Sequence, residues 1–147
     1  MAEDYNKALD IIMDHKFHED LDRWGDYRTL IDLYLDLLPE DHFNNTSLLD
    51  NPQSHSIVLG NLGNAYRDRG QVDKAIYYYE QALVIAKEIG YRRGEGSQLG
   101  NLGLAYSHLG QVEKAIDYYE QALVIGKEIK YPRIINFCEE NLKSIKS

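Results

Sequence analysis

Apolar and small residues recur every three or four positions along much of the chain, which is the spacing of one face of an α-helix. The first clear run is Leu59, Leu62, Gly63 and Tyr66. Gly70 follows it, and a glycine there suits the positive φ that often ends a helix. The same period then resumes over residues 72–89. Because no stretch alternates with the period of two that a half-buried strand needs, the pattern predicts an all-α fold.

The whole pattern occurs again after a step of 40 residues. The segment LGNLGNAYRDRGQVDKAIYYYEQALVIAKEIGYRR begins at Leu59, and LGNLGLAYSHLGQVEKAIDYYEQALVIGKEIKYPR begins at Leu99. A fixed period of about 20–50 residues indicates a solenoid. Each unit is therefore predicted to form two helices that pack on each other. The residues expected to be buried between them are Leu62, Tyr66, Ala75, Tyr79, Leu102, Tyr106, Ala115 and Tyr119.

The spacing L-G-x-x-Y, then G, then A-x-x-x-Y-x-x-A resembles the tetratricopeptide repeat. The matching residues are Leu62, Gly63, Tyr66, Gly70, Ala75, Tyr79 and Ala82, and then Leu102, Gly103, Tyr106, Gly110, Ala115, Tyr119 and Ala122. The usual period of that family is about 34 residues. The longer step here is similar to a subtype found in kinesin light chains, cell-polarity adaptors and the sensor arrays of microbial STAND-class signalling ATPases. The resemblance implies a right-handed α-solenoid of antiparallel helix pairs that binds proteins and is not an enzyme.

The resemblance and the turn residues together predict one array over residues 1–147, with about seven helices. In residues 1–38, large side chains stand where the family pattern has small ones. Pro52 and Pro132 are expected in the first turns of helices, where proline is favoured. The expected parts are a degenerate helix pair at 1–38, a polar loop at 39–52, repeats at 53–90 and 91–130, and a C-terminal capping helix at 131–147.

Charge is distributed unevenly along the sequence. The net charge is −8, and residues 1–58 hold thirteen acidic and four basic residues. The two full repeats are close to neutral. A protein that binds nucleic acid needs a basic stripe to neutralise phosphates. Because the sequence has none, nucleic acid is not an expected partner.

Two further features bear on the cellular location. No apolar run is long enough to cross a membrane, and the acidic N-terminal segment lacks the apolar core of a signal peptide. The single cysteine, Cys138, can form no internal disulfide. These features predict a cytoplasmic protein without a membrane partner. The terminal repeats are the candidate surfaces for self-association.

In the tetratricopeptide family the first helix of each unit lines a concave groove, and the resemblance implies which residues lie there. They are Asn61, Asn64, Arg67, Arg93, Asn101, Leu104, His108 and Asn141. Asn61, Asn101 and Asn141 recur with the repeat. Because an amide can donate to and accept from a peptide group at once, we hypothesise that these three hold a peptide of unknown identity. The alternative is that they tie neighbouring helices together.

Other residues on the same stripe extend this hypothesis. Gly60 and Gly100 leave room for the backbone of a ligand, or alternatively for the close approach of adjacent units. Because these glycines stand where chaperone-binding members of the family carry lysine, binding of chaperone C-termini is not expected. A group of arginines is predicted to pair with ligand carboxylates, the alternative being ordinary surface charge: Arg67, Arg92, Arg93 and Arg133.

Candidate chemistry is sparse. His15 and His18 have a spacing that can hold a metal, but no third ligand is evident, and a surface histidine pair is the favoured interpretation. No nucleophile–base pair or phosphate loop is present, so no catalytic residue, cofactor or metal is expected. The leading hypothesis is a non-catalytic scaffold that binds a peptide or a partner helix. The alternative is a regulatory or sensor module of a larger signal-transduction ATPase, suggested by residues 23–25 (RWG) and the leucine-rich segment after them.

Overall fold

The computed structural model describes Asp32 and residues 51–147, and its regular elements within this part are all α-helices. They are α4 (Pro52–Asp68), α5 (Val72–Glu88), α6 (Arg92–His108), α7 (Val112–Glu128) and α8 (Pro132–Lys146). The all-α prediction is therefore confirmed for the described residues. The predicted number of about seven helices is not matched, because five are described. The helix pair predicted at 1–38, apart from Asp32, and the loop predicted at 39–52, up to residue 50, lie outside the described residues.

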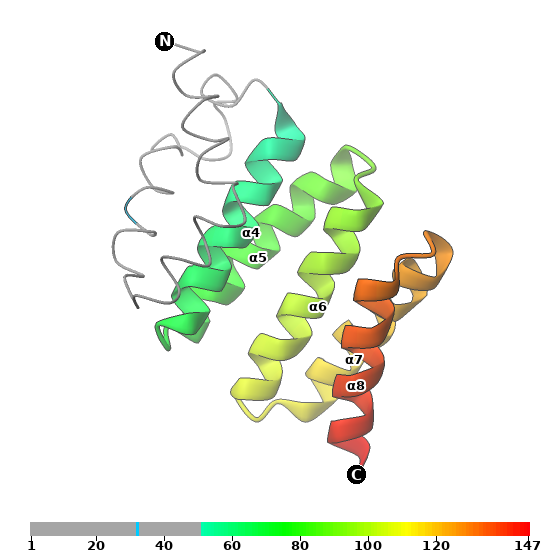
Figure 1. Cartoon of the computed structure of the whole chain (residues 1–147). Coiled ribbons are helices and arrows are strands. Elements are labelled where there is room, and N and C mark those ends of the chain that lie inside the picture. The colour runs from blue at the N-terminus through cyan, green and yellow to red at the C-terminus, as the bar shows by residue number, and fades with distance from the viewer. Residues whose placement is uncertain (1–31, 33–50) are drawn as a thin grey trace.

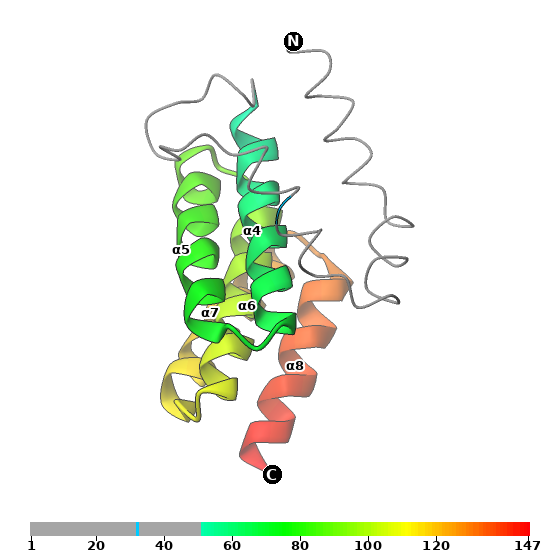
Figure 2. The same cartoon turned by 90° about the vertical axis from the view of Figure 1, so that its left-hand side faces the viewer.

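The helices stack as pairs. α4 packs against α5 and α6 against α7, while α5 contacts α6 and α7 contacts α8. The first helices of successive pairs, α4, α6 and α8, also contact one another in order, and Figure 1 shows them side by side. Figure 2 shows α5 and α7 on one side of α4 and α6. Because α4, α6 and α8 share one face, side chains from three helices meet there.

Proline and a polar cap fix where helices begin. α4 starts at Pro52, and the Oδ1 atom of Asn51 accepts a hydrogen bond of 2.9 Å from the backbone N–H of Gln53. α8 starts at Pro132. Both prolines occupy the first turn, where the missing N–H would have had no intrahelical partner. The two predicted helix starts are confirmed.

The same short turn ends four of the helices. Gly70, Gly90 and Gly110 have φ values of 81°, 69° and 74°, and Lys130 stands at the fourth such position with φ 54°. The following backbone N–H donates to the carbonyl five residues back, as from Tyr131 to Gly126 over 2.9 Å. A side chain with a Cβ is strained in this left-handed conformation, whereas glycine is not. Lys130 is therefore a local weak point between α7 and α8.

Replacing Lys130 with Gly is expected to raise the free energy of unfolding by about 0.5–1 kcal/mol, because it removes the left-handed strain. Urea denaturation followed by circular dichroism measures the change. Lys87→Gly is the matched control, since Lys87 lies in the last turn of α5 and glycine there should lower stability. A Lys130→Gly protein no more stable than wild type would contradict this account of the turn.

Small residues let the helices of a pair approach closely. A Cβ atom added to Gly63 would lie 2.5 Å from Cε1 of Tyr79, and one added to Gly103 would lie 2.8 Å from the same atom of Tyr119. Tyr79, Tyr119, Ala75 and the equivalent alanine of the next unit are fully buried. The glycines at these two places of the family pattern are therefore a packing requirement.

One residue of the predicted core is misassigned. Seven of the eight expected residues are buried, but Tyr106 is only partly buried. Its ring stacks on Tyr118 with centroids 5.4 Å apart, and the Lys114 ammonium lies 4.9 Å from its centroid. Tyr106 therefore covers the edge of the helix pair and does not enter its interior. A helical period gives the direction of a side chain but not how far it extends beyond the contact.

Candidate functional site

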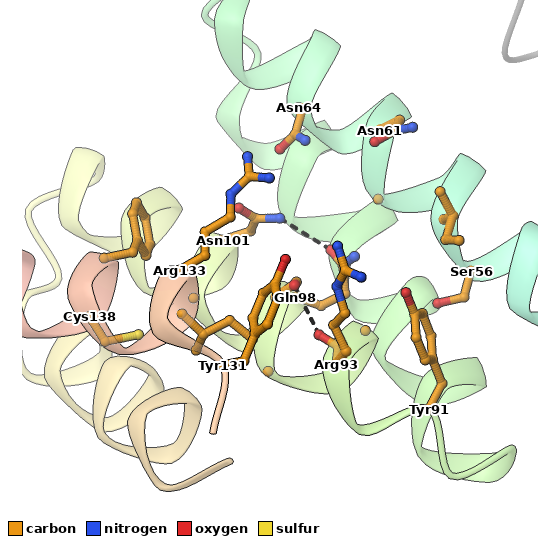
Figure 3. A pocket seen from close by; sticks show the side chains of 18 residues that line it. Ser56, Asn61, Asn64, Tyr91, Arg93, Gln98, Asn101, Tyr131, Arg133 and Cys138 are labelled. Carbon is orange, nitrogen blue, oxygen red and sulfur yellow. Dashed lines mark hydrogen bonds between the residues drawn. The ribbon is translucent and has the colours of Figure 1, made fainter. Parts of the chain in front are cut away.

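A pocket with a volume of about 590 Å³ lies on the face shared by α4, α6 and α8. α4 contributes Ser56, Ile57, Gly60, Asn61 and Asn64. α6 contributes Arg93, Gly94, Gly96, Ser97, Gln98, Gly100 and Asn101, and α8 contributes Arg133, Ile134, Phe137 and Cys138. Tyr91 and Tyr131, which immediately precede α6 and α8, complete the lining. Figure 3 shows these side chains converging from the three helices.

The structure brings together half of the residues that the sequence predicts for the groove. Asn61, Asn64, Arg93 and Asn101 line the pocket. The other four are not part of the lining: Arg67, Leu104, His108 and Asn141. Leu104 packs partly buried against the core, and His108 is exposed at the end of α6. Ligand binding by any of the eight stays a prediction.

Asn64 has a structural task inside the first repeat. Its Oδ1 atom accepts a hydrogen bond of 2.7 Å from the hydroxyl of Tyr79 and one of 3.5 Å from Nη1 of Arg67. Arg67 in turn forms an ion pair of 2.8 Å with Asp68. The Tyr79 bond connects α5 to α4, while the bonds of Arg67 stay within α4. Asn64 therefore follows the alternative interpretation of the amides as ties between helices.

The tyrosines at equivalent positions of the two repeats differ in this bond. Tyr119 takes the place of Tyr79, but Leu104 stands where the first repeat has Asn64. Among the described residues the buried hydroxyl of Tyr119 has no hydrogen-bond partner. Burial raises the pKa of Tyr119 to about 12 and the pKa of Tyr79 above its usual range, so both stay neutral.

This difference gives a paired prediction. Tyr79→Phe should destabilise the protein by about 1 kcal/mol, because it removes a hydrogen bond and leaves Asn64 with one partner fewer. Tyr119→Phe should be neutral or stabilising, because it removes a buried hydroxyl that has no partner. Thermal and urea unfolding of both variants compare the two directly. Equal effects would mean that the Tyr79 bond contributes nothing specific.

The recurring asparagines are not equivalent in the structure. The Nδ2 group of Asn101 donates to Oε1 of Gln98 over 3.4 Å, within α6. The Nδ2 group of Asn141 donates to the backbone carbonyl of Phe137 over 2.7 Å, within α8. Asn141 is thus bonded to its own helix and lies outside the pocket. The predicted row of three amides is reduced to Asn61 and Asn101 at the pocket wall.

At the two groove glycines, a side chain of the next unit occupies the space that a Cβ atom would take, although both glycines also line the pocket. A Cβ atom added to Gly60 would collide with the amide end of Gln98, and one added to Gly100 would lie 3.3 Å from Cε1 of Phe137. The side chain of the next unit already fills each gap. These glycines serve the alternative role, the close approach of adjacent units.

The four predicted arginines divide into two groups. Arg92 pairs with Glu95 over 2.8 Å and also with Glu128 of α7. The hydrogen bonds that its guanidinium donates to Glu128 and Glu95 raise the pKa of Arg92. Arg67 is paired with Asp68 as described above. Only Arg93 and Arg133 line the pocket. Arg67 and Arg92 are thus engaged by acidic residues and are not part of the pocket lining, and their pairing with ligand carboxylates stays a prediction.

Sequence reasoning missed the aromatic walls of the pocket. Tyr91 and Tyr131 stand 40 positions apart, so they recur with the repeat, and both precede a first helix. The guanidinium of Arg93 lies 4.6 Å from the ring centroid of Tyr131. Their recurrence with the repeat is a sequence signal for this pair. The sequence of a short turn does not, however, indicate the direction of a tyrosine side chain. Cys138 is fully buried at the base, and burial raises the pKa of its thiol to about 11.

The described residues contain no cluster of three or more side chains that could hold a metal. His15 and His18, the pair weighed from the sequence, lie outside the described residues. Within the same part of the chain no helix is both long and apolar enough to cross a membrane.

The comparisons with known proteins address the family. The model of the tetratricopeptide repeat matches residues 54–128, which span α4 to α7. The chain belongs to the tetratricopeptide repeat family. This confirms the family resemblance that the repeated L-G-x-x-Y spacing predicted. Tetratricopeptide repeats generally act as non-catalytic scaffolds for protein–protein interactions.

A solved structure supports the same fold. The crystal structure of BtubC (BKLC) from P. vanneervenii matches with a TM-score of 0.71 and 19% sequence identity. The match covers 98% of this chain and 63% of that one, so this tetratricopeptide chain spans less than two thirds of the length of the solved protein. None of the curated proteins compared with the chain matches it.

Proposed function

We propose that this tetratricopeptide array is a non-catalytic scaffold that binds a peptide segment of another protein in the pocket of α4, α6 and α8. The observation that carries the proposal is the pocket itself. It lies on the shared face of three first helices. Polar and aromatic side chains are prominent in its lining, and within residues 51–147 no acidic residue takes part in it. A peptide presents alternating donors and acceptors, and amide side chains match both.

Asn61 and Asn101 are the proposed contacts to the peptide backbone. Both are partly buried at the pocket wall, in equivalent positions of successive repeats. The hydrogen bond from Asn101 to Gln98 uses one N–H of the Asn101 amide and is long, at 3.4 Å. Its Oδ1 atom is therefore able to accept from a peptide N–H. Asn64 is not a proposed contact, because Tyr79 and Arg67 already engage its oxygen.

Replacing Asn61 and Asn101 together with Ala should weaken peptide binding by about 1–3 kcal/mol, because buried peptide groups would lose their partners. Stability should change little, since alanine is the better helix former. The probe is a fluorescein-labelled dodecapeptide selected from a randomised library on the wild-type protein, and fluorescence anisotropy measures its affinity.

The matched control is Asn136→Ala, because Asn136 is exposed on α8 outside the pocket. It should bind the peptide as wild type does. Lost stability with unchanged affinity in the double variant would mean that the amides tie helices together, which is the alternative interpretation.

The same pocket would serve a free-standing scaffold or the sensor module of a larger signalling ATPase. The second role rests on residues 23–25 and the leucine-rich segment after them, which lie outside the described residues apart from Asp32. Membership of the 40-residue subtype stays a prediction in either case. Sequencing the genomic region around the coding sequence for an adjoining P-loop motif separates the two roles.

A further inference from the structure

The charged side chains that line the pocket are all of one sign. Among the described residues that line it, Arg93 and Arg133 are the charged ones, and none is an aspartate or a glutamate. This contrasts with the chain as a whole, which has a net charge of −8. The positive character is therefore a property of the pocket and not of the overall composition.

Neighbouring arginines are neutralised, whereas the two in the pocket are not. Arg67 has Asp68 at 2.8 Å, and Arg92 has Glu95 at 2.8 Å and Glu128. Within residues 51–147 neither Arg93 nor Arg133 forms a salt bridge. Both are exposed at the pocket rim, at equivalent positions of α6 and α8 that lie 40 residues apart. Each is therefore available to an anionic partner.

Arg93 is also held in place. Its guanidinium carbon lies 4.6 Å from the centroid of the Tyr131 ring, and Figure 3 shows Arg93 between Tyr91 and Tyr131. A guanidinium stacked on an aromatic ring keeps its edge N–H groups free, and these match a carboxylate with two parallel hydrogen bonds. Because the stacking restricts the side chain before a ligand arrives, less conformational entropy is lost on binding.

We propose that the pocket selects an acidic peptide segment, in which one carboxylate binds Arg93 and a second binds Arg133, while Tyr131 acts as a positioning residue for Arg93. This inference rests on the peptide-binding function proposed above. Axes of packed helices lie about 8–10 Å apart, and an extended peptide rises about 3.3 Å per residue. The two acidic side chains are therefore expected two or three positions apart.

The experiment starts from a randomised dodecapeptide library selected on the wild-type protein at low salt. Selected peptides should be enriched in Asp and Glu at the spacing of two or three. A labelled peptide from this set should lose affinity by about tenfold or more in the Arg93→Gln/Arg133→Gln protein, because charge-assisted bidentate bonds are the strong ones. Changing its acidic residues to Gln or Asn should have the same effect on the wild type.

Three further variants separate charge, stacking and general effects. Arg69→Gln removes an exposed arginine outside the pocket and should leave the affinity unchanged. Arg93→Lys keeps the charge but loses the planar fork, and Tyr131→Leu removes the ring under Arg93. Both should weaken binding severalfold and to a similar extent. Circular dichroism checks that each variant keeps its helical content and melting temperature.

Ser97→Phe distinguishes failure of this inference from failure of the proposed function. Ser97 lines the pocket, and phenylalanine already occupies the equivalent position of α8 at Phe137, so the variant should fold and obstruct the pocket. If the selected peptides are neutral, the acidic selectivity alone is overturned, provided that Ser97→Phe abolishes their binding and Arg93→Gln/Arg133→Gln leaves it unchanged. If the selection yields no binding peptide, or if Ser97→Phe does not weaken the binding of the selected peptides, both proposals are overturned.

Discussion

Replacing Tyr119 with Ala is expected to lower the free energy of unfolding by about 3–5 kcal/mol, the usual cost of removing a large buried ring. The ring is fully buried beneath Gly103, and it meets Phe137 of α8 edge-on with centroids 6.0 Å apart. Its loss would open a cavity where α6, α7 and α8 meet.

Urea denaturation with two-state fitting measures this cost. Tyr77→Ala is the matched control, because Tyr77 is 50% exposed on α5 and its truncation should cost far less. If Tyr119→Ala proved no more harmful than Tyr77→Ala, the packing of α7 against its neighbours would be misassigned.

Removing residues 132–147 should have the second large effect, because α8 covers the ends of two helices. Ile134 contacts Gly96 of α6 and Gly126 of α7, where a Cβ atom on either glycine would lie 2.9 Å from it. Cys138 and Leu142 are buried on the same side. Without α8 the apolar surface beneath these residues would be exposed, and we expect aggregation or oligomerisation.

Light scattering and size-exclusion chromatography of the truncated protein test this expectation. Ile134→Asp provides a milder variant that keeps the length of α8 but places a charge in an apolar contact, and it should destabilise the protein strongly. Lys143→Ser changes an exposed residue of α8 and serves as the control. A monomeric truncated protein with an unchanged melting temperature would show that α8 does not protect the array.

The sequence predicts the helices well because the signals for their ends are local. Pro52 and Pro132 mark helix starts, and Gly70 and Gly110 mark turns with positive φ. These residues act through their own backbone geometry, so no knowledge of the neighbouring helices is needed. The family pattern of small and aromatic residues then fixes which helices pair.

The pocket was predicted less well because it depends on contacts between repeats. The sequence placed Gly60 beside open space, whereas Gln98 of the next unit occupies it. It also gave Arg92 and Arg93 the same role, although only one of the two adjacent side chains faces the pocket. A helical stripe identifies candidate positions, but it does not show which side chains of the next repeat contact them. Tyr91 and Tyr131 were missed because their direction is set by turns.

The filling of Gly60 and Gly100 has a consequence for folding fidelity. When repeats of two different chains meet, nearly identical repeats can dock in place of one another. The gap at Gly60 receives an amide from Gln98, whereas the gap at Gly100 receives the ring of Phe137. Exchanging the repeats would set Gly60 against Phe137 and Gly100 against Ile57 and Val58. These side chains differ in size from the ones that fill the two gaps in the observed order. The unequal contents of two equal gaps therefore favour a single order of docking.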